Sequence, residues 1–305
     1  MTELIFLLKN NAVVLIGTVF LVGLIIGSFL NVVIYRLPRM MEREWREQCR
    51  ALLDADNGGS TNAATKTTIT GNPPDAPSKP FNLVVPRSRC PKCESLITAR
   101  DNIPVLSYLL LRGRCRHCDA EIPSRYPIIE LTTGIMSAVI AWKFGYSWAG
   151  LAALFLTWAL IALSVIDFDF QLLPDDITLP LIWAGLLLSL FELFSTPQDA
   201  IIGGAAGYLS LWLIFHTFRL ITGKEGMGYG DFKLFAMFGT WLGWKCLPLI
   251  ILLSSFVGAL VGLSLILFRG RDRNLPIPFG PYIAAAGWIY LLFGDSIMGY
   301  YLTNR

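Results

Sequence analysis

Residues 149–168 read AGLAALFLTWALIALSVIDF, and across these twenty positions the single charged residue, Asp167, is next to last. An α-helix of this length extends about 30 Å, which is the thickness of the hydrocarbon core of a bilayer. The stretch therefore predicts a transmembrane helix that ends in a carboxylate.

The rest of the chain repeats this apolar pattern. Of its 305 residues, 54% are hydrophobic and 15% are charged, which is far more apolar than a soluble domain. Seven further apolar runs lie at 12–35, 127–144, 177–195, 200–221, 232–244, 247–268 and 279–302. We predict an all-α polytopic membrane protein with about eight transmembrane helices. Because the run at 232–244 is short and contains glycine, seven or nine helices would also fit.

Lys and Arg predict the orientation of these helices. Of 25 such residues, 21 lie in the alternate loops 36–125, 219–233 and 269–273. Basic residues concentrate in cytoplasmic loops, so we expect these loops at the cytoplasmic face and both termini outside. The first residues, MTELIFLLKN, have no basic region and no cleavage site, so we expect the first helix to be retained. The topology explains the formal net charge of +3, which gives no reason to expect a nucleic-acid partner.

Composition divides the chain into a first transmembrane helix at 1–38, a cytoplasmic loop at 39–126 and a seven-helix membrane domain at 127–305. At the start of the loop, residues 39–52 have the pattern of an amphipathic helix that continues from the first span along the membrane surface. Residues 54–80 contain almost no bulky apolar side chains and cannot bury enough surface to fold. We interpret them as a disordered linker.

Two CxxC motifs follow the linker, CPKC at 90–93 and CRHC at 115–118. Each places two thiolates on one tight turn, and two such turns supply the four sulfur ligands that zinc prefers. We predict that Cys90, Cys93, Cys115 and Cys118 bind one structural zinc in a small module at 86–122, with His117 outside the ligand shell. Two disulfides are the alternative, which a reducing cytoplasm disfavours, and a redox CxxC pair lacks the surrounding strand–helix pattern.

Nucleophilic catalysis with a histidine base has few candidates in this sequence. The two histidines are His117, inside the second CxxC motif, and His216, on an apolar run, where we expect a packed ring with satisfied nitrogens. Cys49 and Cys246 are single and are expected to be small buried or interfacial side chains.

Carboxylates in or beside apolar runs are functional candidates because ionisable groups are unfavourable in a membrane. The candidates are Glu130, Asp167, Asp169, Asp175, Asp176 and Asp231. Each also has a structural interpretation. Asp175 or Asp176 follows Pro174 and suits a helix N-cap, and Glu130 suits an ion pair with Arg125 on the preceding turn.

Asp167 and Asp231 are separated by two predicted crossings, so both are expected at the same depth near the cytoplasmic face. Two carboxylates that share one proton can act together, one as base on a water and the other polarising a carbonyl. Asp231 lies in EGMGYGDFK at 225–233, where Gly228 and Gly230 would let an extended peptide backbone approach and the loop adopt positive φ angles. A polar, glycine-rich connector is the alternative.

A GxGD motif at a membrane helix resembles the intramembrane aspartic proteases, which include the presenilins. A fuller set of motifs resembles the prepilin peptidase family, the type IV prepilin leader peptidases and N-methyltransferases. These motifs are GSFLNVVIYRLP (27–38), the two CxxC pairs, IPVLSYLLLRGRC (103–115), RYPIIE (125–130), IDFDFQLLPD (166–175), GKEGMGYGDFK (223–233) and PIPFGPY (276–282). They cover nearly the whole chain except the linker.

This resemblance implies an aspartic endopeptidase of the bacterial inner membrane with its active site at the cytoplasmic face. Such an enzyme cuts the basic leader of prepilins or of type II secretion pseudopilins after a glycine. It then N-methylates the new terminus with S-adenosylmethionine. The resemblance implies Asp167 and Asp231 as the catalytic pair and links Gly113 and Arg114 to methylation. Some relatives have lysine where Arg114 stands, and no glycine-rich methyltransferase fingerprint is present.

The expected partners are the prepilin N-terminal segment and membrane lipid. The apolar helix of the substrate would lie among the spans, and its basic leader would meet Glu225, Asp169, Asp175 and Asp176. A cation transporter or channel, with intramembrane acids and a zinc-stabilised regulatory loop, is a rival interpretation from another class. A structural partner of a secretion machine is a third.

Overall fold

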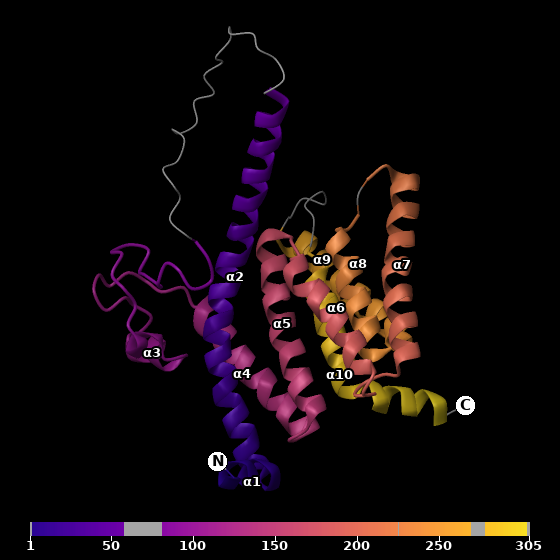
Figure 1. Ribbon diagram of the computed structural model, residues 1–305, viewed down its shortest axis with the longest axis horizontal. Helices are drawn as coiled ribbons and strands as arrows, with labels where there is room; N and C mark the ends of the chain where they lie inside the picture. Colours follow the sequence, from indigo (N-terminus) through magenta and orange to yellow (C-terminus); the bar gives the residue numbers. More distant parts are fainter. Residues whose placement is uncertain (1, 58–80, 225, 270–277, 304–305) are drawn as a thin grey trace.

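A computed structural model describes residues 2–57, 81–224, 226–269 and 278–303, and the linker predicted at 54–80 lies largely outside them. Helices account for most of the described residues (Figure 1). They are α1 (Thr2–Asn10), α2 (Ala12–Asn57), η1 (Ala99–Asn102), α3 (Leu106–Leu110), α4 (Arg125–Phe144), α5 (Trp148–Phe170), α6 (Asp175–Ser189), α7 (Pro197–Thr222), α8 (Tyr229–Leu242), η2 (Trp244–Cys246), α9 (Leu247–Arg269) and α10 (Gly280–Thr303).

Each of the eight predicted apolar runs forms a helix, but the count of about eight spans is not confirmed. Five helices are long and apolar enough to cross a membrane: α2, α4, α5, α7 and α9. The shorter apolar stretch Gly280–Gly294 belongs to α10. Helices α6 and α8 have 15 and 14 residues, so each is only about 21–23 Å long. The chain is a multi-pass helical membrane protein with five candidate spans among its described residues.

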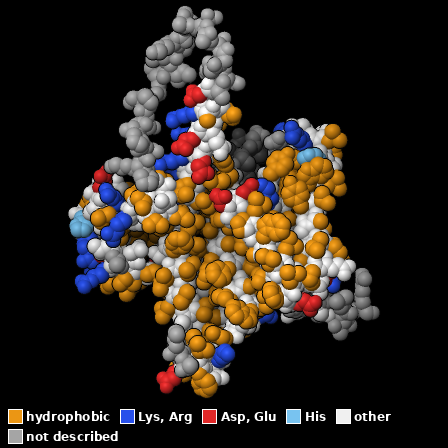
Figure 2. Space-filling view, in the orientation of Figure 1, with side chains coloured by type: hydrophobic (Ala, Val, Ile, Leu, Met, Phe, Trp, Pro, Cys, Tyr) orange, Lys and Arg blue, Asp and Glu red, His pale blue; other side chains and the backbone are white. Residues whose placement is uncertain are grey.

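The outer surface of the helical body suits lipid. Hydrophobic side chains cover the face of α4–α10 seen in Figure 2, and many of them are exposed, such as Trp183, Phe191 and Leu220. Charged side chains gather on the projecting end of α2 and on the small module beside it (Figure 2). An apolar belt below a charged end is the arrangement that a bilayer and its aqueous face require.

Helix α8 is the centre of the membrane body. It packs along α7 and against α6 and α10, and Phe232, Phe235 and Phe238 are almost completely buried. Gly203 of α7 and Gly239 of α8 face each other so closely that a Cβ on Gly203 would lie 2.3 Å from the Gly239 carbonyl oxygen. Small residues allow this approach of two backbones. The result is a closely packed short helix whose first turn carries Asp231.

Helix α2 corrects the expectation of a surface helix at 39–52. It is one continuous helix that passes through Pro38 and rises clear of the other helices (Figure 1). Because the helix does not break at Pro38, residues 39–52 continue in the direction of the membrane part instead of turning along the membrane surface.

The segment between α2 and α4 forms a separate small module with η1 and α3. Its two CxxC turns are each closed by an isolated antiparallel bridge, Arg89 with Leu96 and Arg114 with Glu121. Of its described residues at 81–122, only Cys90 and Gly113 are buried. The module therefore has almost no hydrophobic core of its own.

Candidate active site and metal centre

Asp167 lies in the last turn of α5, where the helix ends. Gln171 follows in the left-handed conformation and donates its backbone N–H to the Asp167 carbonyl oxygen at 2.9 Å. The Asp167 side chain is 6% exposed, and its Oδ2 accepts the backbone N–H of Gly280 at 3.0 Å. Gly280 is the first residue of α10, so the N-terminus of α10 contacts this acid.

Asp231 is the third residue of α8 and is also 6% exposed. Its Oδ2 accepts the backbone N–H of Gly228 at 3.2 Å. Its Oδ1 is buried and has no hydrogen-bond partner among the described residues. A helix N-terminus favours negative charge, whereas a buried oxygen without a partner is unfavourable. A water or a substrate group that donates a hydrogen bond to this oxygen would offset the cost of its burial.

The two acids come together through the loop that carries Leu173. A Cβ built on Gly230 would lie 2.7 Å from Leu173 Cβ, and one built on Gly280 would lie 3.2 Å from Leu173 Cδ2. Leu173 thus packs against the glycine beside each acid. Asp167 and Asp231 are close enough for their charges to interact. Two buried carboxylates from α5 and α8 therefore form one site at the end of the body from which α2 projects.

The expectation of positive φ angles at Gly228 and Gly230 is wrong. Gly228 has φ −86°, and Gly230 lies inside α8, which begins one residue earlier. Their lack of side chains still has consequences, because Gly228 leaves space beside Asp231 and Gly230 allows Leu173 to pack on α8.

Two ion pairs flank the acids, and the sequence predicted neither. Asp169 pairs with Arg125 at the start of α4. Lys233 donates to both carboxylate oxygens of Asp175 at 2.7 Å. The N-cap of α6 is Pro174, so the predicted capping role of Asp175 or Asp176 is wrong. Both carboxylates lie in the first turn of α6, where their negative charge interacts favourably with the helix dipole.

Glu130 does not pair with Arg125. The two residues are five positions apart, whereas helical neighbours that face each other are three or four apart. The buried Glu130 Oε2 accepts the backbone N–H of Val105 at 2.7 Å. Glu130 therefore joins α4 to the beginning of α3 in the module. Glu225 lies outside the described residues.

The four cysteines of the CxxC motifs converge at one point. Their sulfur atoms all lie within 4.8 Å of one another, with Cys90 and Cys118 3.7 Å apart and Cys93 and Cys115 4.0 Å apart. A tetrahedron of thiolates around zinc at about 2.3 Å has sulfur atoms about 3.8 Å apart. The cluster can hold a metal ion, and its donor set and spacing fit zinc. All four cysteines are free of disulfides.

The two turns of the metal cluster repeat the same backbone pattern. The Cys90 N–H donates to the Ser95 carbonyl at 3.0 Å, and the Cys115 N–H donates to the Ala120 carbonyl at 2.8 Å. A hydrogen bond between the Ser95 hydroxyl and Cys93 lowers the pKa of the Cys93 thiol to about 6. A lower pKa favours the thiolate, which is the form that binds metal.

Gly113 and Arg114 precede the second metal turn. Gly113 has φ +70° and packs against the Tyr108 ring, since a Cβ there would lie 2.9 Å from the Tyr108 hydroxyl. Arg114 lines a hollow of about 580 Å³. The other lining residues are Leu110, Leu111, Arg112, Cys115, Arg116 and Asp119. Arg116 is paired with Asp101 at 2.6 Å, so Arg112 and Arg114 provide the unpaired positive charge of this hollow among the described residues.

The remaining histidine and the single cysteines lie outside these sites. The His216 ring packs against the Trp212 ring at a tilt of 34°, with a centroid distance of 4.1 Å. Its Nδ1 has no partner among the described residues, so the expectation of satisfied nitrogens is wrong. Cys246 is buried as expected, whereas Cys49 is exposed on the projecting part of α2.

Comparisons with known proteins cover nearly the whole chain. Residues 21–144 match the bacterial peptidase A24 N-terminal domain, and residues 154–263 match the type IV leader peptidase family. The prepilin leader peptidase/N-methyltransferase of Aeromonas hydrophila is 55% identical over 286 residues, which cover 94% of this chain and 93% of the relative. The protein of that name from Pseudomonas aeruginosa is 51% identical, covering 92% and 91%, and that from Stutzerimonas stutzeri is 48% identical, covering 97% and 96%. No solved structure matches the chain.

Proposed function

Because the chain belongs to the type IV leader peptidase family, we propose that Asp167 and Asp231 are the acids with which it cleaves prepilins. The chain is a peptidase and an N-methyltransferase, as its relatives are named. The observation that carries the assignment of the acids is the pair of buried carboxylates from α5 and α8, with one buried and unpartnered oxygen on Asp231.

The dyad performs peptide hydrolysis with one shared proton. Like charges this close disfavour double ionisation, so one carboxylate accepts a proton from water while the other, protonated, donates a hydrogen bond to the scissile carbonyl. The hydroxide adds to the carbonyl carbon. The tetrahedral intermediate then collapses when the leaving nitrogen takes a proton from the dyad. Backbone N–H groups of Gly280 and Gly228 hold one oxygen of each acid and fix the orientation of the dyad.

Acidic side chains that already form ion pairs within the protein are less available to the basic leader of the substrate. Asp169 and Asp175 are occupied by Arg125 and Lys233, so the contact expected between these acids and a basic leader is not favoured. Asp176 is exposed, makes no ion pair among the described residues and remains available to the leader. We infer that the apolar helix of a type IV prepilin lies in the membrane beside α5 and α8 with its leader toward Asp176.

We assign the methyl-transfer reaction to the cysteine-containing module between α2 and α4. S-adenosylmethionine supplies a sulfonium-bound methyl group, and its carboxylate needs a cationic partner. The hollow beside Arg112 and Arg114 has the size of small-molecule sites, and the unpaired guanidinium groups fit a carboxylate. These residues would hold the cofactor, while the turn at Gly113 positions Arg114 beside the second metal turn.

Zinc in the cysteine cluster would be structural. Four thiolates fill the four positions of the metal and leave no site for a substrate or water. The metal would fix the two turns and, through Cys115, the adjoining Arg114. The proposed domains are the first span, the loop with this module and the catalytic helical body.

The proposed location is the bacterial inner membrane with the acids at the cytoplasmic face. Support comes from the concentration of Lys and Arg in alternate loops and from the position of both acids at one end of the body. A reporter that is active only outside the cytoplasm is expected to work after Arg305 and to fail within 54–80. Activity within 54–80 would reverse the orientation.

The cleavage function is tested with purified protein, detergent, S-adenosylmethionine and a full-length prepilin, using mass spectrometry of the product. The expected product lacks the leader and carries one methyl group at its new terminus. A transporter or channel, which the family does not favour, would produce no new polypeptide end.

A further inference from the structure

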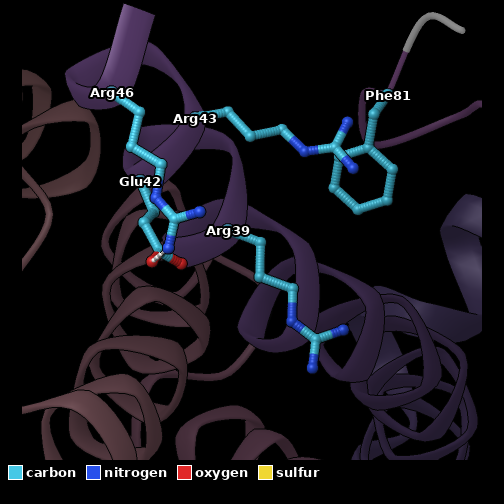
Figure 3. A pocket seen from close by; sticks show the side chains of 5 residues that line it. All are labelled: Arg39, Glu42, Arg43, Arg46 and Phe81. Atoms are coloured by element: carbon cyan, nitrogen blue, oxygen red, sulfur yellow. Dashed lines mark hydrogen bonds and ion pairs between the residues drawn. The ribbon is translucent and has the colours of Figure 1, made fainter. Parts of the chain in front are cut away.

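A second hollow, of about 260 Å³, lies beside α2 beyond its apolar part. It is lined by Arg39, Glu42, Arg43, Arg46 and Phe81 (Figure 3). None of these residues belongs to the acid dyad or to the cysteine cluster, and Phe81 is the first described residue of the module. The three arginines follow one another at spacings of four and three, so one face of α2 carries all of them.

The wall opposite α2 is held in place by Arg36. The buried Arg36 side chain donates from Nη1 to the Asn82 carbonyl oxygen at 2.8 Å and from Nη2 to the Pro86 carbonyl oxygen at 2.6 Å. These bonds fix the segment that begins at Phe81. The centre of the Phe81 ring lies 4.3 Å from the guanidinium carbon of Arg43. The hollow is therefore formed by the fold and does not depend on a ligand.

Positive charge in this hollow is not compensated. Glu42 is already paired with Arg46 at 2.6 Å. The guanidinium carbon of Arg39 lies 3.5 Å from the centre of the Tyr35 ring, and neither Arg39 nor Arg43 meets a carboxylate among the described residues. Stacking on a ring uses the face of a guanidinium group and leaves the N–H donors at its edge free.

We propose that this hollow binds the phosphodiester headgroup of an anionic membrane phospholipid through Arg39 and Arg43. Planar guanidinium groups match the geometry of phosphate oxygens. The apolar run at 12–35 ends about one helical turn before Arg39, which puts the hollow at the level of the headgroups of the leaflet that contains anionic lipid. Tyr35 is exposed four residues before Arg39 and offers an apolar contact to the first part of an acyl chain.

The test measures binding of phosphatidylglycerol to the full chain in detergent by native mass spectrometry. The variant Arg39→Gln/Arg43→Gln removes both charges, and Arg50→Gln/Arg87→Gln removes two exposed charges outside the hollow. We expect the first to weaken phosphatidylglycerol binding at least about tenfold and the second less than about twofold. Equal losses would show a general electrostatic attraction to anionic lipid and would overturn the site.

Two further measurements identify the source of the phosphate and guard against misfolding. Inorganic phosphate, or an acidic peptide, that displaces the lipid at equal concentration would overturn the lipid assignment, while failure to displace it supports the proposal. Phe81→Ala opens the hollow without changing its charge and is expected to weaken phosphatidylglycerol binding about threefold or more. Unchanged thermal midpoints without added lipid show that the variants are folded.

Discussion

Lys233, two residues after Asp231, donates to both carboxylate oxygens of Asp175 at 2.7 Å and joins the first turn of α8 to the first turn of α6. Asp169, two residues after Asp167, pairs with Arg125 and joins the end of α5 to the start of α4. Each proposed catalytic acid therefore lies one turn or less from an ion pair with another helix. These pairs can position the acids because they fix the helix ends that carry them.

The first prediction is that Lys233→Asp lowers kcat for prepilin cleavage at least about tenfold, because it sets a carboxylate against Asp175 and disturbs the first turn of α8. Exchange of both charges, Lys233→Asp with Asp175→Lys, is expected to restore most of the activity. Half-exposed ion pairs contribute only about 0.2–1 kcal/mol to stability, so the thermal midpoint of the single variant should change little.

A matched control lies elsewhere in the protein. Lys245 is 3.8 Å from Asp199 in another pair that joins two helical elements, and Lys245→Asp is expected to leave kcat unchanged. Normal cleavage by Lys233→Asp, or no recovery in the double variant, would show that the first pair has no positioning role.

The second prediction is that Asp167→Asn and Asp231→Asn each abolish leader cleavage. An amide has nearly the shape of a carboxyl group but cannot accept the proton of the attacking water. Because one shared proton is required, the rate for the unmodified protein should fall on both sides of an optimum pH. The measurement is prepilin cleavage across a pH series.

Methyl transfer to an already cleaved pilin serves as the folding control for both variants. Asp169→Asn removes an ion pair but neither acid of the dyad, and a loss of less than about tenfold is expected. Substantial cleavage by Asp231→Asn would disprove the dyad.

The sequence predicted the helices well, because a long apolar run in an apolar environment must satisfy its backbone hydrogen bonds internally, and an α-helix does so. It does not establish the number of spans, because a helix buried in protein and a helix exposed to lipid can have the same apolar composition. Helix α8 contacts α6, α7 and α10, so apolar side chains are favourable on all of its faces. Its 14 residues are fewer than the number that a transmembrane helix usually needs.

The candidate acids could also be found from the sequence, because charge at the end of an apolar run is rare. Their partners could not. Arg125 and Asp169 are 44 residues apart and Lys233 and Asp175 are 58 apart, and only the folded helices bring them together. The contact between Gly280 and Asp167 could not be predicted from the sequence either, because these residues are 113 positions apart.

The third prediction concerns the metal. Module residues 81–122 bury almost no apolar side chains, so metal binding must supply much of the folding energy of the module. Cys115→Ser, or treatment with a strong chelator, is expected to release zinc, make the module sensitive to protease and reduce methylation more than cleavage. Elemental analysis and limited proteolysis measure the first two effects. Cys49→Ser is the control, and intact methylation by a metal-free protein would contradict the prediction.

The fourth prediction uses the space around the acids. A Cβ on Gly280 would lie 2.7 Å from Asp167 Oδ2, closer than atoms can approach, whereas one on Gly228 would lie 3.8 Å from Asp231 Oδ2 in ordinary contact. Gly280→Ala should therefore displace the Asp167 carboxylate, weaken its hydrogen bond from the Gly280 N–H and lower kcat at least about tenfold, because small displacements of reacting groups reduce rates strongly. Gly228→Ala should retain more activity.

Gly17 provides the control for this prediction. A Cβ added to Gly17 would have no atom within 4 Å, so Gly17→Ala is expected to leave kcat unchanged. If Gly280→Ala cleaves prepilin as fast as that control, contact between α10 and Asp167 does not position the acid for catalysis.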